Sequence, residues 1–431
     1  MPALHLAPRP ADPEPEAGLS PSDRRRFMRN AIGTIGPMLA TGTALAQASN
    51  PARQVTLPPT AAATEPKEPP PEVVDPPGER VGFALVGLGH LTLDRLMPAF
   101  GHSKHCKPVA LVSGDREKAK RVAAQHGIRD EAIYDYASFD RIAQNPEVQV
   151  VYIVLPNSMH AEFTIRAARA GKHVLCEKPM ATSVAECERM IEACRAARVK
   201  LMLAYRSQYE PHSRALVEMV KKGELGTLKE LITTNSQNMG DPAQWRLKKA
   251  LAGGGAMPDV GVYCLNAARF LSGEEPSEVL AWMHSTPNDP RFREVEETMH
   301  FLLRFPSGFQ ATCHTGYGAH KSQMLRLMGS DAWAEMDPAY AYDGVTLRRE
   351  RVVDGKGAVE TPAIRERDQF ALEMDHMAVC VRTGREPLTG GAEGLQDHRV
   401  MEAIYESARA NGKAVKLAPP RDAVRGPALE G

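Results

Sequence analysis

The sequence predicts an α/β protein in two parts, a doubly wound parallel sheet followed by an α+β domain with a large, mostly antiparallel open sheet. Between residues 80 and 205, short apolar runs with the length of buried strands alternate with helical patterns. Repeated strand–helix units of this length need crossovers that cover both faces of a parallel sheet. After residue 205, β-rich runs with Gly and Pro turns predict the second part.

The first domain is expected over residues 80–205 and the second over residues 206–418, with a flexible tail at 419–431. In the first domain, strands are predicted at 81–86, 108–113, 148–155, 173–176 and 200–205, and helices at 117–126, 158–170 and 184–197. In the second domain, helices are predicted at 212–222, 259–271 and 392–410, and strands at 228–234, 278–284, 298–305, 309–315 and 414–417.

Composition gives no indication of a nucleic-acid or membrane partner. The 431 residues are 43% hydrophobic and 25% charged, which is ordinary for a globular protein. Formal net charge is zero, so no field of the whole molecule favours nucleic acid or an anionic membrane. No Cys-x-x-Cys pair occurs, and the nearest cysteines, Cys187 and Cys194, lie two turns apart on a predicted helix. The seven cysteines are therefore expected to be free thiols, and no metal site is predicted.

The first 46 residues resemble a twin-arginine signal peptide. Arg24 and Arg25 precede an apolar run over residues 31–46 that is too short and Gly-rich to span a membrane, and Asp23 stands where Ser or Thr is usual. Small residues predict cleavage after Ala46 or Ala48. The protein is therefore expected to be exported folded to the periplasm without a remaining membrane anchor. The alternative is a disordered basic tail.

Residues 47–79 predict a Pro-rich arm. Three consecutive prolines at 69–71 and two at 76–77 favour extended polyproline backbone over helix. Few bulky apolar side chains are present, so the arm cannot form its own core. It is expected to wrap a neighbouring subunit, or else to be a solvated tether.

Gly87 and Gly89 directly follow the first predicted strand and open a helix, which is the context of a Rossmann dinucleotide-binding domain. There the glycines let the backbone approach a pyrophosphate whose charge the helix N-terminus attracts. The third position of the motif is Thr92 rather than Gly or Ala, so helix and strand are expected to lie slightly farther apart. The alternative is a chance Gly-x-Gly turn.

The second strand ends at Ser113, where an NAD enzyme would carry an acidic residue for the ribose hydroxyls. A small hydroxyl leaves room for a 2′-phosphate, with which Lys118 could pair, helped by Arg116. NADP is therefore favoured over NAD. The alternative is that Lys118 and Arg116 are solvated helix charges.

Two further motifs carry candidate chemistry. Glu177 and Lys178 end a predicted strand, the edge at which ligands lie in such folds, so the ammonium would stand where cofactor and substrate meet. A Gly-rich loop at 253–255 leads into a helix on which Asp259 and Tyr263, four residues apart, share one face. The alternatives are a surface lysine, an aspartate that complements the helix dipole and a core tyrosine.

Together these segments resemble the Gfo/Idh/MocA oxidoreductases from about Phe83 to Tyr405. Many members have His at the position of Tyr263. A tyrosine there resembles the glucose-fructose oxidoreductase subgroup. The resemblance is carried by residues 84–89, 112–114, 133–136, 152–163, 171–183, 244–247 and 253–266. His90, Thr92 and Pro258 depart from the family pattern.

The resemblance implies roles for the candidate residues. Lys178 would lie beside the nicotinamide, Tyr263 would be the acid/base, and Asp259 would help to hold the sugar. It implies cofactor contacts for Gly87, Gly89, Ser113, Lys118, Leu155, Asn157, His160, Glu177, Lys178, Trp245 and Arg246, with Asn157 and His160 near the nicotinamide ribose, and a substrate contact for Tyr342.

The expected activity is oxidation of an aldose at C1 to the lactone with tightly bound NADP, followed by reduction of a second sugar, fructose or an aldose, to an alditol. Outside the cytoplasm little free nicotinamide is available, so a retained cofactor would be regenerated in place by a ping-pong cycle. The alternatives are a dehydrogenase with dissociable NAD(P) and a non-catalytic sensor. A homo-oligomer, dimer or tetramer, is expected, with the arm over the adenine end of the cofactor.

Overall fold

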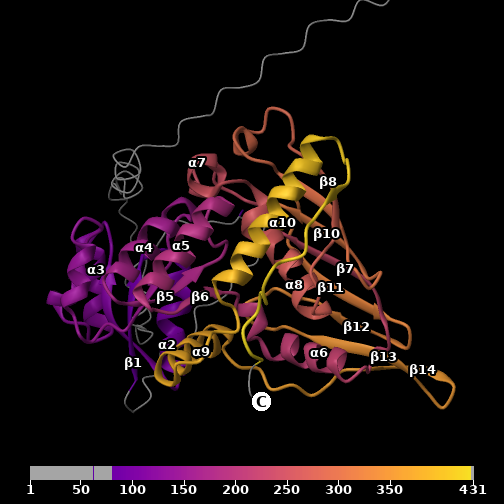
Figure 1. Cartoon of the computed structure of the whole chain (residues 1–431), viewed down its shortest axis with the longest axis horizontal. Coiled ribbons are helices and arrows are strands. Elements are labelled where there is room, and N and C mark those ends of the chain that lie inside the picture. Colours follow the sequence, from indigo (N-terminus) through magenta and orange to yellow (C-terminus); the bar gives the residue numbers. More distant parts are fainter. Residues whose placement is uncertain (1–61, 63–79, 429–431) are drawn as a thin grey trace, which may run out of the picture. The chain divides into compact units, whose positions relative to one another are not determined.

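The computed structural model describes residue 62 and residues 80–428, and a parallel sheet organises the first part of the chain (Figure 1). Its six strands are β1 (Val81–Val86), β2 (Cys106–Val112), β3 (Ile133–Tyr134), β4 (Val150–Ile153), β5 (His173–Glu177) and β6 (Leu201–Ala204). They lie in the order β3-β2-β1-β4-β5-β6. The helices α2 (Met97–His102), α3 (Arg116–Gln125), α4 (His160–Arg169) and α5 (Val184–Ala197) connect them.

Burial explains why most of these strands could be predicted from the sequence. Every residue of β1 and β4 is buried, because helices cover both faces of a parallel sheet. The strand order reverses between β1 and β4, and ligands of such sheets lie at the carboxyl ends of the strands beside that reversal. The predicted fold class is confirmed, and it places the site at the ends of β1, β2, β4, β5 and β6.

A nine-stranded sheet organises the second part, in the order β14-β13-β12-β11-β7-β10-β9-β8-β15. Only the β7–β10 pair is parallel. The strands are β7 (Leu228–Ser236), β8 (Glu278–His284), β9 (Thr298–Arg304), β10 (Gln310–Gly316), β11 (Ser322–Gly329), β12 (Ala332–Met336), β13 (Leu347–Val353), β14 (Lys356–Glu360) and β15 (Val415–Lys416). The helices are α6 (Pro211–Lys221), α7 (Lys249–Ala252), α8 (Val262–Ser272), α9 (Gln369–Thr383) and α10 (Gly391–Arg409).

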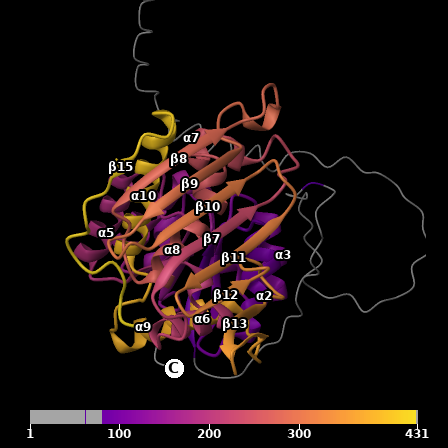
Figure 2. The same cartoon turned by 90° about the vertical axis from the view of Figure 1, so that its right-hand side faces the viewer.

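One face of this sheet packs on helices and the other does not. Figure 2 shows the strands in front, with α8 and α10 behind them. Leu231 and Leu303 are buried toward the helices, whereas Ile232, Trp282 and Leu302 are 38%, 46% and 39% exposed. The outer face is therefore bare of helices in the described part of the chain.

The sequence analysis missed α7, α9, β3 and the strands β11 to β14. The β13–β14 hairpin shows why: β13 reads Leu-Arg-Arg-Glu-Arg-Val-Val, and Arg349 and Arg351 both pair across the hairpin with Glu360. Charged cross-strand pairs stabilise an edge hairpin without the alternation of apolar residues that sequence analysis detects.

Several expectations concern the chain as a whole. All seven cysteines are buried and free, as predicted. None of the helices within 80–428 is long and apolar enough to cross a membrane. The signal peptide and arm lie outside the described residues except for Ala62, whose N–H donates to the Asn238 carbonyl at 3.1 Å. In the segment predicted as a tail, Arg425 pairs with Glu275 and with buried Glu393.

Candidate active site

The glycine-rich turn after β1 is shaped to let a ligand approach. Gly87 has a φ of +99°, and a Cβ there would collide with the Val154 carbonyl. A Cβ at Gly89 would meet nothing within 4 Å, so this position faces open space. Thr92, the departure from the motif, is fully buried and donates its hydroxyl to the Gly87 carbonyl at 2.6 Å. The threonine thus ties the helix start to the turn, and the turn fits a dinucleotide pyrophosphate.

Ser113 and Lys118 lie in the segment that leaves the carboxyl end of β2 and begins α3. Ser113 directly follows β2, is 4% exposed, and accepts the Asp115 N–H at 3.1 Å. The Lys118 ammonium donates to the Leu88 carbonyl inside the glycine-rich turn at 3.1 Å. Burial lowers the pKa of Lys118, while Asp115 opposes the change. Arg116 points elsewhere, to the Ile133 carbonyl at 3.3 Å.

Asp259 is the centre of the site. The Lys178 ammonium donates to its Oδ1 at 3.1 Å and to its carbonyl at 2.7 Å. Its Oδ2 accepts from Arg246 Nε at 3.0 Å and from the Tyr317 hydroxyl at 2.6 Å. Burial alone would raise the pKa of Asp259, but Lys178 and Arg246 outweigh it and hold that pKa well below its usual range. The carboxylate is therefore charged, with donors on both oxygens.

Lys178 joins Asp259 to Tyr263. It stands directly after β5, and its side chain is 10% exposed. The ammonium lies 4.7 Å from the centroid of the Tyr263 ring. Burial would lower the pKa of Lys178, but Tyr263 and Asp259 raise it above its ordinary value. The three residues singled out from the sequence are thus in contact, and the lysine is a cation.

Arg206 supplies a second cation that sequence analysis missed. It is 5% exposed, and its Nε donates to the Tyr263 hydroxyl at 3.1 Å. Its terminal nitrogens donate to the Tyr340 carbonyl at 2.8 Å and to Gln369 at 2.6 Å. The signal was available, because Arg206 follows β6 and polar residues at the carboxyl ends of parallel strands face the ligand site.

Tyr342 lies at the rim. It is 37% exposed, and the guanidinium carbons of Arg206 and Arg95 lie 4.6 Å and 4.8 Å from the centroid of its ring. Arg95 comes from the helical turn after the glycine-rich motif, and Arg206 from the end of β6. A partly exposed aromatic face beside two cations is suited to contact a sugar ring.

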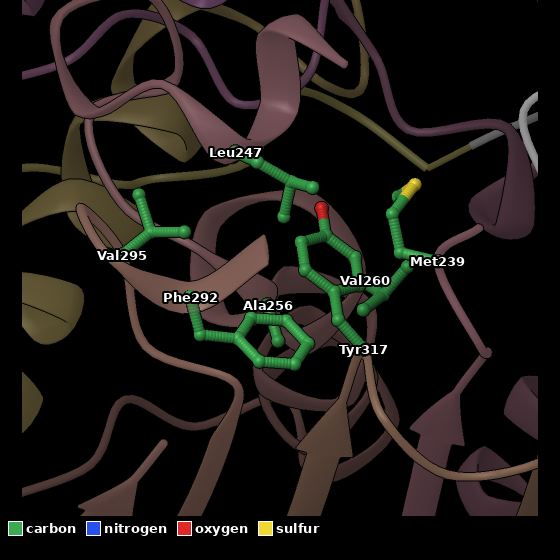
Figure 3. Packing of buried hydrophobic residues seen from close by; sticks show 7 residues of the cluster. All are labelled: Met239, Leu247, Ala256, Val260, Phe292, Val295 and Tyr317. Carbon is green, nitrogen blue, oxygen red and sulfur yellow. The ribbon is translucent and has the colours of Figure 1, made fainter. Parts of the chain in front are cut away.

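Tyr317 reaches Asp259 from a hydrophobic cluster. Figure 3 shows its ring among the buried side chains Met239, Leu247, Ala256, Val260, Phe292 and Val295, with the hydroxyl near Leu247. The ring is fully buried, so packing fixes the hydroxyl that donates to Asp259. Tyr317 follows β10 and was not predicted from the sequence.

Glu296 holds the glycine-rich loop that precedes Asp259. Its carboxylate accepts the backbone N–H groups of Gly255 at 2.8 Å and Met257 at 2.9 Å, and the Tyr405 hydroxyl at 2.8 Å. A Cβ on Gly255 would collide with the Glu296 backbone. Glycine and carboxylate together fix the start of the helical segment that presents Asp259.

Other predicted residues connect loops. The Asn157 amide donates to the Ala252 carbonyl at 2.8 Å and so joins the first domain to the second. Fully buried His160 has its ring nitrogens 2.8 Å from the Leu155 carbonyl and 2.9 Å from the Pro179 carbonyl. Both nitrogens are engaged within the protein, so His160 holds the two loops together.

Glu177 and Trp245 also lie at the site. Glu177 is buried, and its Oε2 accepts the Lys178 N–H at 3.2 Å. Trp245 stacks with Arg246, whose guanidinium carbon lies 4.6 Å from the indole ring. No group of His, Cys, Asp and Glu within residues 80–428 is arranged to hold a metal ion.

Comparison with known proteins agrees with this geometry. Residues 81–205 match the model of an oxidoreductase family with an NAD-binding Rossmann fold, and residues 213–335 match the GFO/IDH/MocA C-terminal domain. The chain belongs to the Gfo/Idh/MocA oxidoreductase family. It is an enzyme of the oxidoreductase class.

Three similar proteins illustrate the comparison. D-xylose 1-dehydrogenase [NADP(+)] of Haloarcula marismortui is 33% identical over 335 residues, which cover 76% of this chain and 91% of that protein. The crystal structure of aldose-aldose oxidoreductase from Caulobacter crescentus, complexed with glycerol, is 46% identical with a TM-score of 0.76, over 79% of this chain and all of that one. A levoglucosan dehydrogenase with NADH and L-sorbose, 22% identical with a TM-score of 0.68 over 80% of this chain and all of that one, shares the fold.

Replacing Ser113 with Asp is expected to weaken NADP binding relative to NAD. A carboxylate repels the 2′-phosphate and accepts from a free 2′-hydroxyl. The measurement is the ratio of the two dissociation constants, with Asp115→Asn as a control that alters a neighbouring carboxylate. If the ratio does not move in Ser113→Asp, Ser113 is not at the ribose.

Proposed function

We propose that this protein oxidises an aldose at C1 to the lactone with NADP that stays bound, and then reduces a second sugar, fructose or an aldose, to an alditol. The observation that carries the proposal is the contact of Lys178 with both Asp259 and Tyr263 at the end of β5. Likeness to the aldose-aldose oxidoreductase, 46% identical, supports transfer between two sugars.

The residues suit proton transfer at a sugar hydroxyl. NADP, when bound, accepts a hydride from one sugar and returns it to the next. In the first half-reaction, Tyr263 as the phenolate takes the proton of the C1 hydroxyl while the C1–H bond breaks, which leaves the lactone carbonyl. In the second, Tyr263 returns that proton to the carbonyl oxygen of the acceptor. Lys178 and Arg206 face the Tyr263 ring and stabilise negative charge there in both directions.

Asp259, Arg246 and Tyr342 are assigned to the sugar. The Asp259 carboxylate orients the side chains of Lys178 and Arg246. Asp259, Lys178 and Arg246 all carry charged groups that are suited to hydrogen-bond sugar hydroxyls. NADP is the proposed cofactor. Lys118 of α3, which donates to the glycine-rich turn, and Ser113, directly after β2, fit a 2′-phosphate, and the xylose dehydrogenase relatives are named for NADP.

A second candidate is a dehydrogenase that exchanges its NADP with solution. The 33% identity to D-xylose 1-dehydrogenase [NADP(+)] favours it. The two functions differ in whether the cofactor survives purification, and one experiment separates them.

Glucose or xylose added to the dialysed protein without cofactor is expected to produce the near-ultraviolet absorbance of reduced nicotinamide, and fructose added next is expected to remove it. Tyr263→Phe should retain the cofactor but slow both steps by at least about 10²-fold, because the ring still packs while proton transfer is lost. Absorbance that appears only when NADP is supplied would favour the dissociable dehydrogenase. A fully active Tyr263→Phe would show that another group moves the proton.

Export and assembly form part of the proposal. The twin-arginine pathway carries folded proteins, so export through it to the periplasm is compatible with an enclosed cofactor. Assembly into a dimer or tetramer is supported by the exposed Ile232, Trp282 and Leu302 on the outer face of the large sheet. The arm over residues 47–79 is proposed to lie along a neighbouring subunit and cover the adenine end of the cofactor.

Protein from the periplasmic fraction is expected to begin after Ala46 or Ala48 by intact mass and to be oligomeric by light scattering. Lysine at both Arg24 and Arg25 should block export, because that pathway reads the arginine pair. Removal of residues 47–79 should reduce the oligomer and let NADP leave on dialysis. Unprocessed protein in the cytoplasm would contradict export. If the truncated protein keeps both its number of subunits and its bound NADP, the arm is only a tether.

A further inference from the structure

Three buried acidic side chains meet behind Lys178. Tyr152 comes from β4, Glu177 from the end of β5, and Glu373 from α9. Tyr152 and Glu373 have no exposed surface, and Glu177 is 8% exposed. The Tyr152 hydroxyl lies 2.9 Å from Glu177 Oε1 and 3.3 Å from Glu373 Oε2. One phenol oxygen therefore bridges two carboxyl groups.

The hydrogen count at this bridge requires an extra proton. A tyrosine hydroxyl has one hydrogen and can donate to one carboxylate, and an ionised carboxylate only accepts. Two ionised carboxylates would therefore leave one of the two oxygen–oxygen contacts without a hydrogen, although Tyr152 and Glu373 have no exposed surface. If one carboxyl is protonated, it donates to the phenol oxygen while the phenol donates to the other, and both contacts become hydrogen bonds.

The surroundings assign the proton to Glu373. Glu177 has the shorter contact with Tyr152, and its second oxygen accepts the Lys178 N–H at 3.2 Å. Glu373 Oε1 has no hydrogen-bond partner among the described residues. An unpaired oxygen costs less on a neutral acid than on a buried carboxylate.

The charges around Glu373 agree with this assignment. The titratable groups that face it are Glu177, Arg206, Tyr152 and Tyr209. Burial and Glu177 raise the pKa of Glu373 well above its ordinary value, and Arg206, which is engaged with Tyr263, opposes them. Burial also raises the pKa of Glu177, but Lys178 and the Tyr152 hydrogen bond oppose it.

We propose that Glu373 carries a proton at neutral pH and that the chain Glu373–Tyr152–Glu177 is a positioning device that fixes the backbone of Lys178. Loss of the Glu373 proton would place two carboxylates on one phenol, and repulsion would displace Glu177 and the Lys178 backbone that donates to it. Turnover would then decline as pH rises. The kinetic part of this inference rests on the proposed role of Lys178, whereas the protonation of Glu373 does not.

Infrared spectroscopy tests the proton directly. A carboxylic acid has a C=O stretch above the amide band that a carboxylate lacks. In full-length protein at neutral pH, Glu373→Gln should remove one such band. Glu406→Gln, the same change at an exposed carboxylate of α10, should leave the spectrum unchanged in that region. If Glu373→Gln removes no such band, or if a band is lost only in Glu177→Gln, the assignment is overturned. In unsubstituted protein the same band should disappear as pH rises, and a band that stays through the alkaline decline in turnover overturns the link between them.

Kinetics tests the positioning role. Glutamine imitates the protonated acid, so Glu373→Gln should retain turnover at neutral pH and lose the alkaline decline. Glu373→Leu removes the donor and should lower kcat by about tenfold or more with little change in KM, because a small misplacement of Lys178 affects the reaction step most. Identical alkaline limbs in unsubstituted protein and Glu373→Gln, or full turnover in Glu373→Leu, would exclude the role. If aldose oxidation itself is absent, the proposed function fails, while the infrared result still decides the proton.

Discussion

The buried ion pair between Lys178 and Asp259 is the interaction on which the site depends. Lys178 follows β5 of the parallel sheet, and Asp259 lies in the helical turn before α8 of the second domain, so neither domain alone contains the site. Removing two charges from water is costly, and attraction offsets this only when the remaining hydrogen-bonding positions are filled. Asp259 meets that requirement through Arg246 and Tyr317, and Lys178 through the Asp259 carbonyl.

Packing around the pair explains how it is kept in place. A hydrophobic cluster fixes Tyr317, and Glu296 with Tyr405 fixes the glycine-rich loop before Asp259. On the other side, Glu177 accepts the Lys178 N–H. These supports come from elements far apart in the sequence, which gives the few reacting groups a rigid setting. Rigid donors aimed at developing charge are the usual source of electrostatic catalysis.

How well each feature could be predicted from the sequence depends on how far apart in the chain its interacting residues lie. Five of the six parallel strands were found because strands buried on both faces read as continuous apolar runs. Lys178, Asp259 and Tyr263 were found because each lies in a local motif at a strand end or helix start. Arg206 follows a predicted strand and could have been found there, but its contact with Tyr263 spans 57 residues and was not visible in the sequence. Tyr317 was missed because its contact with Asp259 spans 58 residues and nothing local marks it. The β13–β14 hairpin was missed because ion pairs stabilise it.

The most direct test of the account is the single-turnover rate of hydride transfer from aldose in Asp259→Asn, measured together with the dissociation constant of NADP. Asparagine keeps the shape but removes the charge that holds Lys178 and Arg246. The account predicts a rate about 10²-fold lower, as expected when reacting groups are misplaced. NADP binding should change much less, because the side-chain contacts of Asp259 are with Lys178, Arg246 and Tyr317 and not with Ser113 or Lys118. An unchanged rate would contradict the central role of the Lys178–Asp259 pair.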